Sequence, residues 1–191
     1  MKKLKGLVEF ISGSPQFRIT ESFDENAPRY IYYSQNDLMD DFFDMISEQG
    51  ENKEVRTKDK VNTLATGDII FSLITGKAAM VRQAHAGYLY TQNYIKLLPG
   101  AAVDAMFLVY LLNESQSVRK QLCVGLQGSQ VLKYTLQQLK ELHIENLPPF
   151  ARQQAVGRIY FKQMHLKALR NRAADLEKLI CLAKLAEVSK Q

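Results

Sequence analysis

Residues 145–160 read ENLPPFARQQAVGRIY, and the two prolines in this stretch separate a long first part of the chain from a shorter last part. Proline is favourable in the first turn of a helix, because its missing N–H would be unpaired there and its φ angle already suits a helix. Between Pro149 and Lys190 there is no further proline and only one glycine. We therefore predict a single helix over this range, about 60 Å long at 1.5 Å rise per residue.

Such a helix is too long to lie wholly against a domain of 148 residues, so we divide the chain into a domain over 1–148 and a helix over 149–191. Apolar side chains recur along the helix at the three- and four-residue intervals that are typical of a coiled coil. This seam consists of Ile159, Leu166, Leu169, Ala173, Leu176, Ile180 and Ala183. It predicts a homodimer through the helix. The alternative is a helix folded back on its own domain, but exposed leucines beyond the domain edge would favour aggregation.

The composition is that of an ordinary globular chain, with 191 residues and 46% hydrophobic content. No apolar run approaches the 18 or so residues that a membrane span requires, and the N-terminus lacks a signal-peptide core. We therefore expect a cytoplasmic protein with no membrane partner. Of the net charge of +5, the helix carries nine basic and three acidic side chains, which leaves 16 basic and 17 acidic ones in the domain.

Short runs of strand-type and helix-type sequence alternate in the domain, which indicates a mixed α/β fold. We expect strands at 5–11, 30–33, 69–73, 78–82 and 93–98, and helices at 36–46, 104–113, 115–123 and 136–142. Asn36 or Asp37 is the expected N-cap of the first helix. The aspartates Asp40, Asp41 and Asp44 are expected to form a solvated face of that helix, in preference to a metal site.

Motifs of known catalytic chemistry are absent. The sequence contains no G-x-G and no G-K-[ST], so it lacks the glycine loops that bind dinucleotides, adenosylmethionine or nucleotide phosphates. The segment NLPPF is similar to the Asn-Pro-Pro-aromatic motif of amino-directed DNA methyltransferases, but Leu147 interrupts it. The three histidines are too far apart in sequence to predict a ligand set. We therefore expect no catalytic residue, no metal site and no cofactor in this chain.

Three segments, taken in order and followed by a long helix, resemble one half of the DNA-sequence specificity subunit of type I restriction-modification systems. They are LATGDIIFSL (64–73), TQNYIKLLPGAAVDAMFLVYLLN (91–113) and LQGSQVLKYTLQQLKELHIENLPPFARQQAVGRI (126–159). In that family a Pro-Pro-Leu-Ala-Glu-Gln-x-x-Ile type of sequence opens the conserved helix. The matching residues here are Pro148, Pro149, Phe150, Ala151, Gln153 and Val156, whereas Arg152 stands where glutamate is usual.

The resemblance implies an α/β target recognition domain that inserts loops into DNA, followed by a helix that acts as a ruler between two such domains. A complete subunit of this family carries two domain-plus-helix units, and this chain carries one, so we expect a half-size subunit that pairs with a second copy. The implied partners are double-stranded DNA, a DNA methyltransferase (modification) subunit that binds adenosylmethionine, and a restriction subunit that uses ATP and magnesium.

DNA contacts are expected from basic side chains to phosphates and from polar side chains on loops to base edges. The predicted DNA-binding residues are Arg18, Lys58, Lys60, Lys77, Gln127, Ser129, Gln130 and Lys133. Two alternatives remain open from the sequence. One is a coiled-coil module that binds a protein and never binds DNA, and the other is a stand-alone DNA methyltransferase, which the missing glycine loop disfavours.

Overall fold

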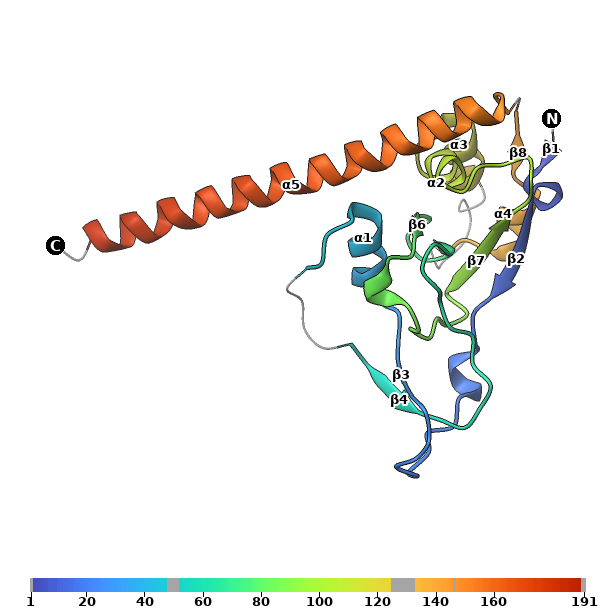
Figure 1. Cartoon of the computed structure of the whole chain (residues 1–191), viewed down its shortest axis with the longest axis horizontal. Helices are drawn as coiled ribbons and strands as arrows, with labels where there is room; N and C mark the ends of the chain where they lie inside the picture. The colour runs from blue at the N-terminus through green and yellow to red at the C-terminus, as the bar shows by residue number, and fades with distance from the viewer. Residues whose placement is uncertain (1, 48–51, 125–132, 146, 190–191) are drawn as a thin grey trace.

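The computed structural model describes residues 2–47, 52–124, 133–145 and 147–189. They form a mixed α/β domain from which one long helix, α5 (Phe150–Val188), projects to one side (Figure 1). The predicted fold class and the predicted helix are both confirmed. Pro149 precedes the helix as its N-cap with extended backbone, so it lies one position earlier than a proline in the first turn.

The core of the domain is a four-stranded antiparallel sheet in the order β2-β7-β5-β6. The strands are β2 (Val8–Ser12), β5 (Ile69–Ser72), β6 (Ala78–Met80) and β7 (Tyr94–Pro99). All four residues of β5 are buried, and because side chains alternate between the two faces of a strand, both faces of the sheet must be covered there. The start of the strand expected at 5–11 is wrong, since Leu4–Gly6 forms a 3-10 turn, η1.

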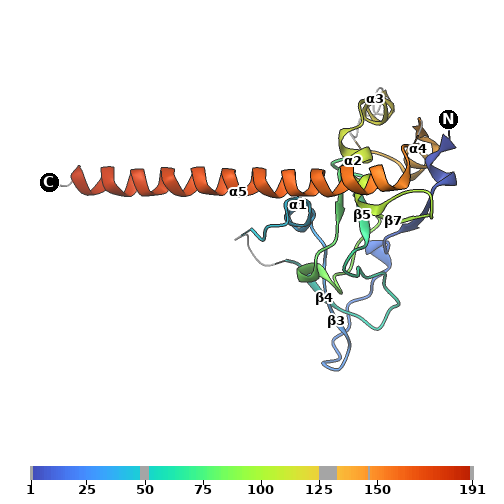
Figure 2. The ribbon, with the colours of Figure 1, turned by 45° about the horizontal axis from the view of Figure 1, so that its top comes forward.

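Two smaller antiparallel pairs lie outside this sheet. The N-terminal β1 (Lys2–Lys3) pairs with β8 (His143–Ile144), and β3 (Arg29–Ile31) pairs with β4 (Glu54–Arg56). The β3–β4 ribbon and the loop before it extend away from α5, at the opposite end of the domain in both ribbon views (Figures 1 and 2). The domain therefore presents its ribbon and its helix on different sides.

The four shorter helices are α1 (Gln35–Phe43), α2 (Ala105–Glu114), α3 (Gln116–Val124) and α4 (Leu136–Glu141). Both α1 and α2 contact β6 on one side and α5 on the other. The predicted N-cap of α1 is wrong, because Ser34 caps the helix: its hydroxyl accepts the Asp37 N–H and the Asp37 carboxylate accepts the Ser34 N–H. This reciprocal pair is a capping box, which starts the helix earlier than the apolar pattern indicates.

All the buried residues of α5 lie in its first half. Gln153, Gly157 and Tyr160 are buried on one face of the helix, whereas every described residue from Leu169 to Ser189 is exposed. The helix therefore leaves the domain and does not fold back along it, which rules out the alternative considered from the sequence. In the described part of the chain, no helix has both the length and the hydropathy needed to cross a membrane.

Candidate nucleic-acid interface

The ribbon arm, by which we mean residues 16–31 and 54–60, is the most prominent projection of the domain apart from α5. Arg29 and Arg56 are direct cross-strand neighbours in its β3–β4 pair. Arg29 forms an ion pair with Glu54, and Arg56 donates from Nη1 to the carbonyl oxygen of Glu25 at 2.5 Å. A two-stranded ribbon is narrow enough to enter the major groove of DNA.

Three of the predicted DNA-binding residues lie on this arm. Arg18 is exposed at the end of the 3-10 turn η2 (Gln16–Arg18), with its guanidinium 5.5 Å from the centroid of the Phe17 ring. Lys58 and Lys60 are exposed on the segment that follows β4. The backbone N–H of Thr20 donates to the Asp59 carboxylate at 2.7 Å, so the two segments, which are distant in sequence, are held side by side.

Acidic residues are interleaved with the basic ones on the arm. Lys58 Nζ lies 2.5 Å from the Asp24 carboxylate, and this hydrogen bond lowers the pKa of Asp24. The Lys58–Asp24 and Arg29–Glu54 pairs are both solvent-exposed, and exposed ion pairs contribute only about 0–1 kcal/mol to stability. Phosphate groups can therefore replace these carboxylates as partners of the basic side chains at little cost to the fold.

Two further predicted DNA-binding residues, Lys77 and Lys133, are not brought to the ribbon arm. Lys77 is half-buried, with Nζ 5.8 Å from the centroid of the Phe42 ring in α1, and burial lowers its pKa. Lys133 Nζ donates to Asn93 Oδ1 at 2.7 Å, in the loop before β7. The predicted residues Gln127, Ser129 and Gln130 lie outside the described residues.

Sequence reasoning missed Arg29 and Arg56, because their proximity depends on how β3 and β4 pair. It also missed Phe17 and Phe23 on the arm, which are 76% and 98% exposed. The run RYIYY at 29–33 indicated a strand but carried no information on its partner. The local signal in the sequence that could have pointed to the arm was an aromatic residue in a polar loop, such as Phe23.

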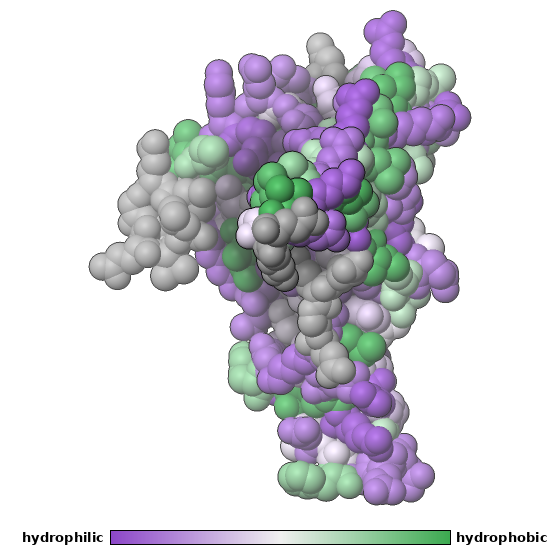
Figure 3. Space-filling view, turned by 90° about the vertical axis from the view of Figure 1, so that its left-hand side faces the viewer, coloured by the Kyte–Doolittle hydropathy of each residue, from purple (hydrophilic) through white to green (hydrophobic). Residues whose placement is uncertain are grey.

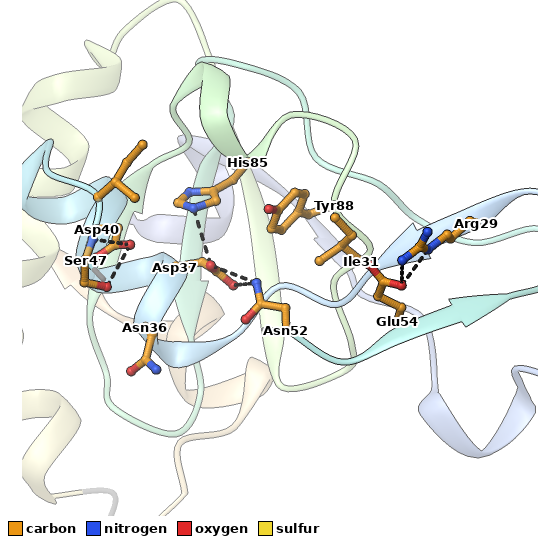
Figure 4. Close-up of a pocket in the computed structure, with 11 residues that line it drawn as sticks. Arg29, Ile31, Asn36, Asp37, Asp40, Ser47, Asn52, Glu54, His85 and Tyr88 are labelled. Carbon is orange, nitrogen blue, oxygen red and sulfur yellow. Dashed lines mark hydrogen bonds and ion pairs between the residues drawn. The ribbon is translucent and has the colours of Figure 1, made fainter. Parts of the chain in front are cut away.

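A polar pocket of about 530 Å³ lies between α1, the ribbon and the 3-10 turn η3 (Gln83–His85) (Figure 4). His85 is buried there, with Nδ1 at 2.8 Å from Asp41 and Nε2 at 3.4 Å from Asp37. Asp41 also accepts the Tyr33 hydroxyl at 2.6 Å. Asp41 is fully buried, so the expected solvated face is wrong at this position; the tertiary structure supplies the hydrogen-bond partners that let a carboxylate lie inside.

The charges in this pocket act on the histidine in opposite directions. Burial disfavours the charged imidazolium of His85, but the hydrogen bond and negative charge of Asp41, with further charge from Asp37 and Asp40, outweigh burial and raise the pKa. Burial together with the charge and hydrogen bond of Asp41 raises the pKa of Tyr33 well above its usual value. The cluster thus links α1 to η3 as a network of partnered groups.

The same network supports the base of the ribbon arm. Asn52, which lies two residues before β4, donates to both carboxylate oxygens of Asp37 at 3.0 Å. On the other strand, the Leu89 N–H donates to the Ile31 carbonyl oxygen at 2.8 Å. Within the described ranges, no group of three or more His, Cys, Asp or Glu side chains is arranged to hold a metal ion. We interpret the pocket as a structural support of the ribbon.

The predicted seam of α5 is an exposed face of the helix. Its members are Ile159, Leu166, Leu169, Ala173, Leu176, Ile180 and Ala183, all of them exposed. At 3.6 residues per turn they lie about half a turn from Gln153, Gly157 and Tyr160, so the seam points away from the domain. Figure 3 looks toward the C-terminal end of α5 and shows hydrophobic residues among hydrophilic ones there.

Comparison with known proteins gives matches of structure alone. No protein-family model and no curated protein matches the sequence, whereas twelve solved chains match the structure. The HsdS subunit from Thermoanaerobacter tengcongensis matches with a TM-score of 0.57 and 18% identity, over 93% of this chain and 41% of that one. The type I restriction-modification S subunit from M. genitalium matches with a TM-score of 0.51 and 19% identity, over 95% and 41%.

A third match is to a structure that describes complex assembly and conformational transition of the type I restriction-modification system, with a TM-score of 0.61 and 16% identity. It covers 96% of this chain and 42% of the other. The chain thus spans less than half the length of the solved structures it matches, and the match includes both its domain and its long helix. The sequence resemblance to a specificity subunit is confirmed at the level of fold.

Proposed function

We propose that this chain is a DNA-recognition unit of a type I restriction-modification specificity subunit. The observation that carries the proposal is the match of its whole architecture, domain and projecting helix together, to S subunit structures over 93–96% of the chain. A fold alone does not define a function. The ribbon arm, with paired arginines and exchangeable surface ion pairs, adds a site whose chemistry suits DNA phosphates and base edges.

In this proposal the ribbon arm makes the first contacts with DNA. Arg18, Lys58 and Lys60 position the domain on the phosphate backbone, and Arg29 and Arg56 lie where a ribbon in the major groove would meet base edges. Lys77, Lys133, Gln127, Ser129 and Gln130 remain candidates for a second contact region. Lys77 and Lys133 lie outside the arm, so the arm and these two lysines would contact the same DNA only if the DNA runs across the domain.

The seam of α5 pairs the unit with a second one, and we propose a homodimer. Seven exposed apolar positions on a helix that leaves its domain need a partner to remove them from water, and a second copy of the same seam provides it. A two-fold pair holds two identical reading surfaces apart, so the target is an interrupted inverted repeat with half-site centres about 10 base pairs apart, or one helical turn.

The chemical steps belong to other subunits in this proposal. A DNA methyltransferase (modification) subunit supplies bound adenosylmethionine, and a restriction subunit supplies ATP-dependent cleavage with magnesium. This chain contributes recognition and no catalytic residue of its own. Its place of action would be the cytoplasm, where its DNA targets and these partners meet.

A binding selection tests the proposal. The purified chain, alone and with its methyltransferase subunit, is incubated with a pool of duplexes that carry randomised bases, and the retained duplexes are sequenced. We expect an interrupted repeat to be enriched, with an affinity that falls steeply as salt rises because counterions are released. A chain that forms dimers through α5 but enriches no sequence under either condition would instead be a protein-interaction module.

A further inference from the structure

The start of α5 is fastened to the domain by a buried amide side chain. Gln153 is 2% exposed. Its Oε1 accepts the Asp104 N–H at 3.0 Å, and its Nε2 donates to the carbonyl oxygens of Ala102 and Pro148 at 3.1 and 2.9 Å. These three bonds tie the first turn of α5 to the loop before α2 and to the prolines that precede α5. A buried amide with fixed partners permits little rotation of the helix about this point.

One turn further along, the backbones of α5 and α2 come into close contact. A Cβ atom at Gly157 would lie 2.6 Å from Met106 Cβ and 2.7 Å from the Phe107 nitrogen. Glycine is unfavourable inside a helix, and this is the only glycine in α5, so its place is explained by this crossing point. Any larger side chain would force α5 away from α2, because the atoms it meets include backbone.

Two further contacts fix the direction of the helix beyond this crossing. The Tyr160 hydroxyl donates to Glu114 Oε1 at 2.8 Å, at the far end of α2. His165 Nδ1 lies 3.1 Å from the Phe43 carbonyl oxygen, at the end of α1. The contacts of Gln153, Gly157, Tyr160 and His165 therefore follow one face of α5 over more than three turns, and we call this set the joint.

The part of α5 beyond the joint projects from the domain (Figure 1) and acts as a lever on it. Residues 166–188 extend about 35 Å beyond it at 1.5 Å per residue, so a change of about 5° at the joint displaces the end of the helix by about 3 Å. That displacement is close to the rise of one base pair, about 3.4 Å. Two paired helices can hold their DNA-binding domains at a fixed separation on DNA only if the angle between α5 and its domain varies by no more than a few degrees.

We propose that Gln153 and Gly157 are positioning residues that set the gap between the two half-sites, by fixing the angle at which α5 leaves the domain. This inference rests on the proposed function, because it assumes two units paired through α5 on one DNA. In this inference the joint and the length of α5 together determine which gap between half-sites is preferred. The residues that contact bases determine only the sequence of each half-site.

The two exposed cysteines allow the angle to be measured without DNA. Cys123 lies in α3 of the domain and Cys181 near the end of α5, and both are free and exposed. With a nitroxide spin label on each, and labelled chains diluted into unlabelled ones, electron spin resonance gives the distance between domain and helix end within one chain. We expect Gln153→Ala and Gly157→Ala to shift that distance by about 3 Å or to broaden its distribution. Gln154→Ala, at the neighbouring exposed position, is the matched control and should change nothing.

The same variants are then compared in a selection with duplexes that carry the selected half-sites at every gap length. We expect the wild-type protein and Gln154→Ala to prefer one gap, and both joint variants to lose about tenfold of that preference or to move it by a base pair, with the half-site sequence unchanged. A variant that is merely less stable binds all gaps less tightly by the same factor, and that result would overturn the inference.

Unchanged spin–spin distances, or changed distances with an unchanged gap preference, would also overturn it. If Gly157→Ala fails to fold, Gln153→Ala decides the outcome, since it removes hydrogen bonds and introduces no clash. Failure of the proposed function can be distinguished from failure of this inference alone. In the first case the wild-type protein would enrich no interrupted repeat, and the role of the joint in setting the gap would be refuted as well.

Discussion

His85 is the residue whose environment differs most from what its sequence neighbours indicate. Its imidazole joins Asp37 and Asp41 of α1 to η3 inside the polar pocket, and Asp37 in turn holds Asn52 at the base of the ribbon. The charge of one buried side chain is thereby connected to the position of the ribbon arm. We therefore expect the stability of the domain to depend on pH.

We expect His85→Gln to remove part of that pH dependence. The pKa of His85 in the folded state is raised above its ordinary value of 6.5, so its stabilising contribution is complete below about pH 6.5 and is lost as pH rises through the folded-state pKa. The free energy of unfolding of the wild-type protein, measured by urea denaturation, should therefore fall between about pH 6 and 8 more than that of His85→Gln. His143→Gln, at an exposed position, is the control. Parallel curves for wild type and His85→Gln would contradict the prediction.

A second prediction at this scale concerns phosphate contacts of the arm. We expect Lys58→Ala and Lys60→Ala to weaken DNA binding by similar factors for every sequence, because phosphate contacts carry no base information. Each change should reduce the slope of log affinity against log salt by about 1. Filter binding or fluorescence anisotropy at several salt concentrations measures this slope. Lys120→Ala, exposed on α3, should leave it unchanged, and equal slopes for all variants would exclude Lys58 and Lys60 as phosphate contacts.

At the scale of the element, α5 combines two faces with different tasks. The face that holds Gln153, Gly157 and Tyr160 is buried against the domain, and the face that holds the seam is exposed along the whole helix. A substitution on the seam can therefore alter how α5 pairs with another helix without disturbing how α5 packs against its own domain. Exposed apolar residues outside the seam, at Leu179, Leu182, Leu185 and Val188, widen the apolar surface toward the C-terminal end.

We expect the double change Leu169→Glu and Leu176→Glu to convert the dimer to monomers, since four buried carboxylates across a paired seam would be costly to desolvate. The domain should stay folded, because both side chains are exposed and lie on the opposite side of α5 from its buried residues Gln153, Gly157 and Tyr160. Sedimentation velocity gives the oligomeric state, and circular dichroism gives the fold. The matched control is Arg170→Gln with Lys178→Gln, which lowers the net charge by the same two units at positions outside the seam. A double seam variant that still sediments as a dimer would refute the interface.

For the whole molecule, the proposed arrangement of DNA-binding domain and spacing helix would determine the form of the target. Two identical units related by a two-fold axis meet the same half-site on opposite strands. The ribbon arm and α5 lie at opposite ends of the domain (Figure 1), so in the proposed dimer α5 would set the spacing without covering the arm.

We therefore expect methylation mapping of a genome that encodes this chain and its methyltransferase subunit to find an interrupted inverted repeat. Its half-site centres should be about 10 base pairs apart, one turn of DNA. Deletion of the gene for this chain is the control and should remove methylation at that motif alone. A continuous motif would contradict the two-fold arrangement, whereas two unrelated halves would indicate pairing with a second, different unit.

The sequence by itself determined the elements whose signals are local. Pro149, the absence of later prolines and the seam spacing predicted α5, and alternating apolar runs predicted the strands of the central sheet and the helix α2. The order of three segments led to the specificity-subunit fold. The helix and strand signals can be read from short stretches, because helix and strand periodicity are local properties, and the resemblance depended only on the order of segments along the chain.

Only the tertiary structure decided what depends on residues far apart in the chain. Asp41 and His85 are separated by 44 positions and Gln153 and Asp104 by 49, so neither buried partnership has a local signature. The pairing of Arg29 with Arg56 likewise depends on strand register. A buried polar group is stable only when folding brings a hydrogen-bond partner next to it. For this reason the cluster of His85 with Asp37 and Asp41, the ribbon arm and the joint of α5 could be identified only from the tertiary structure.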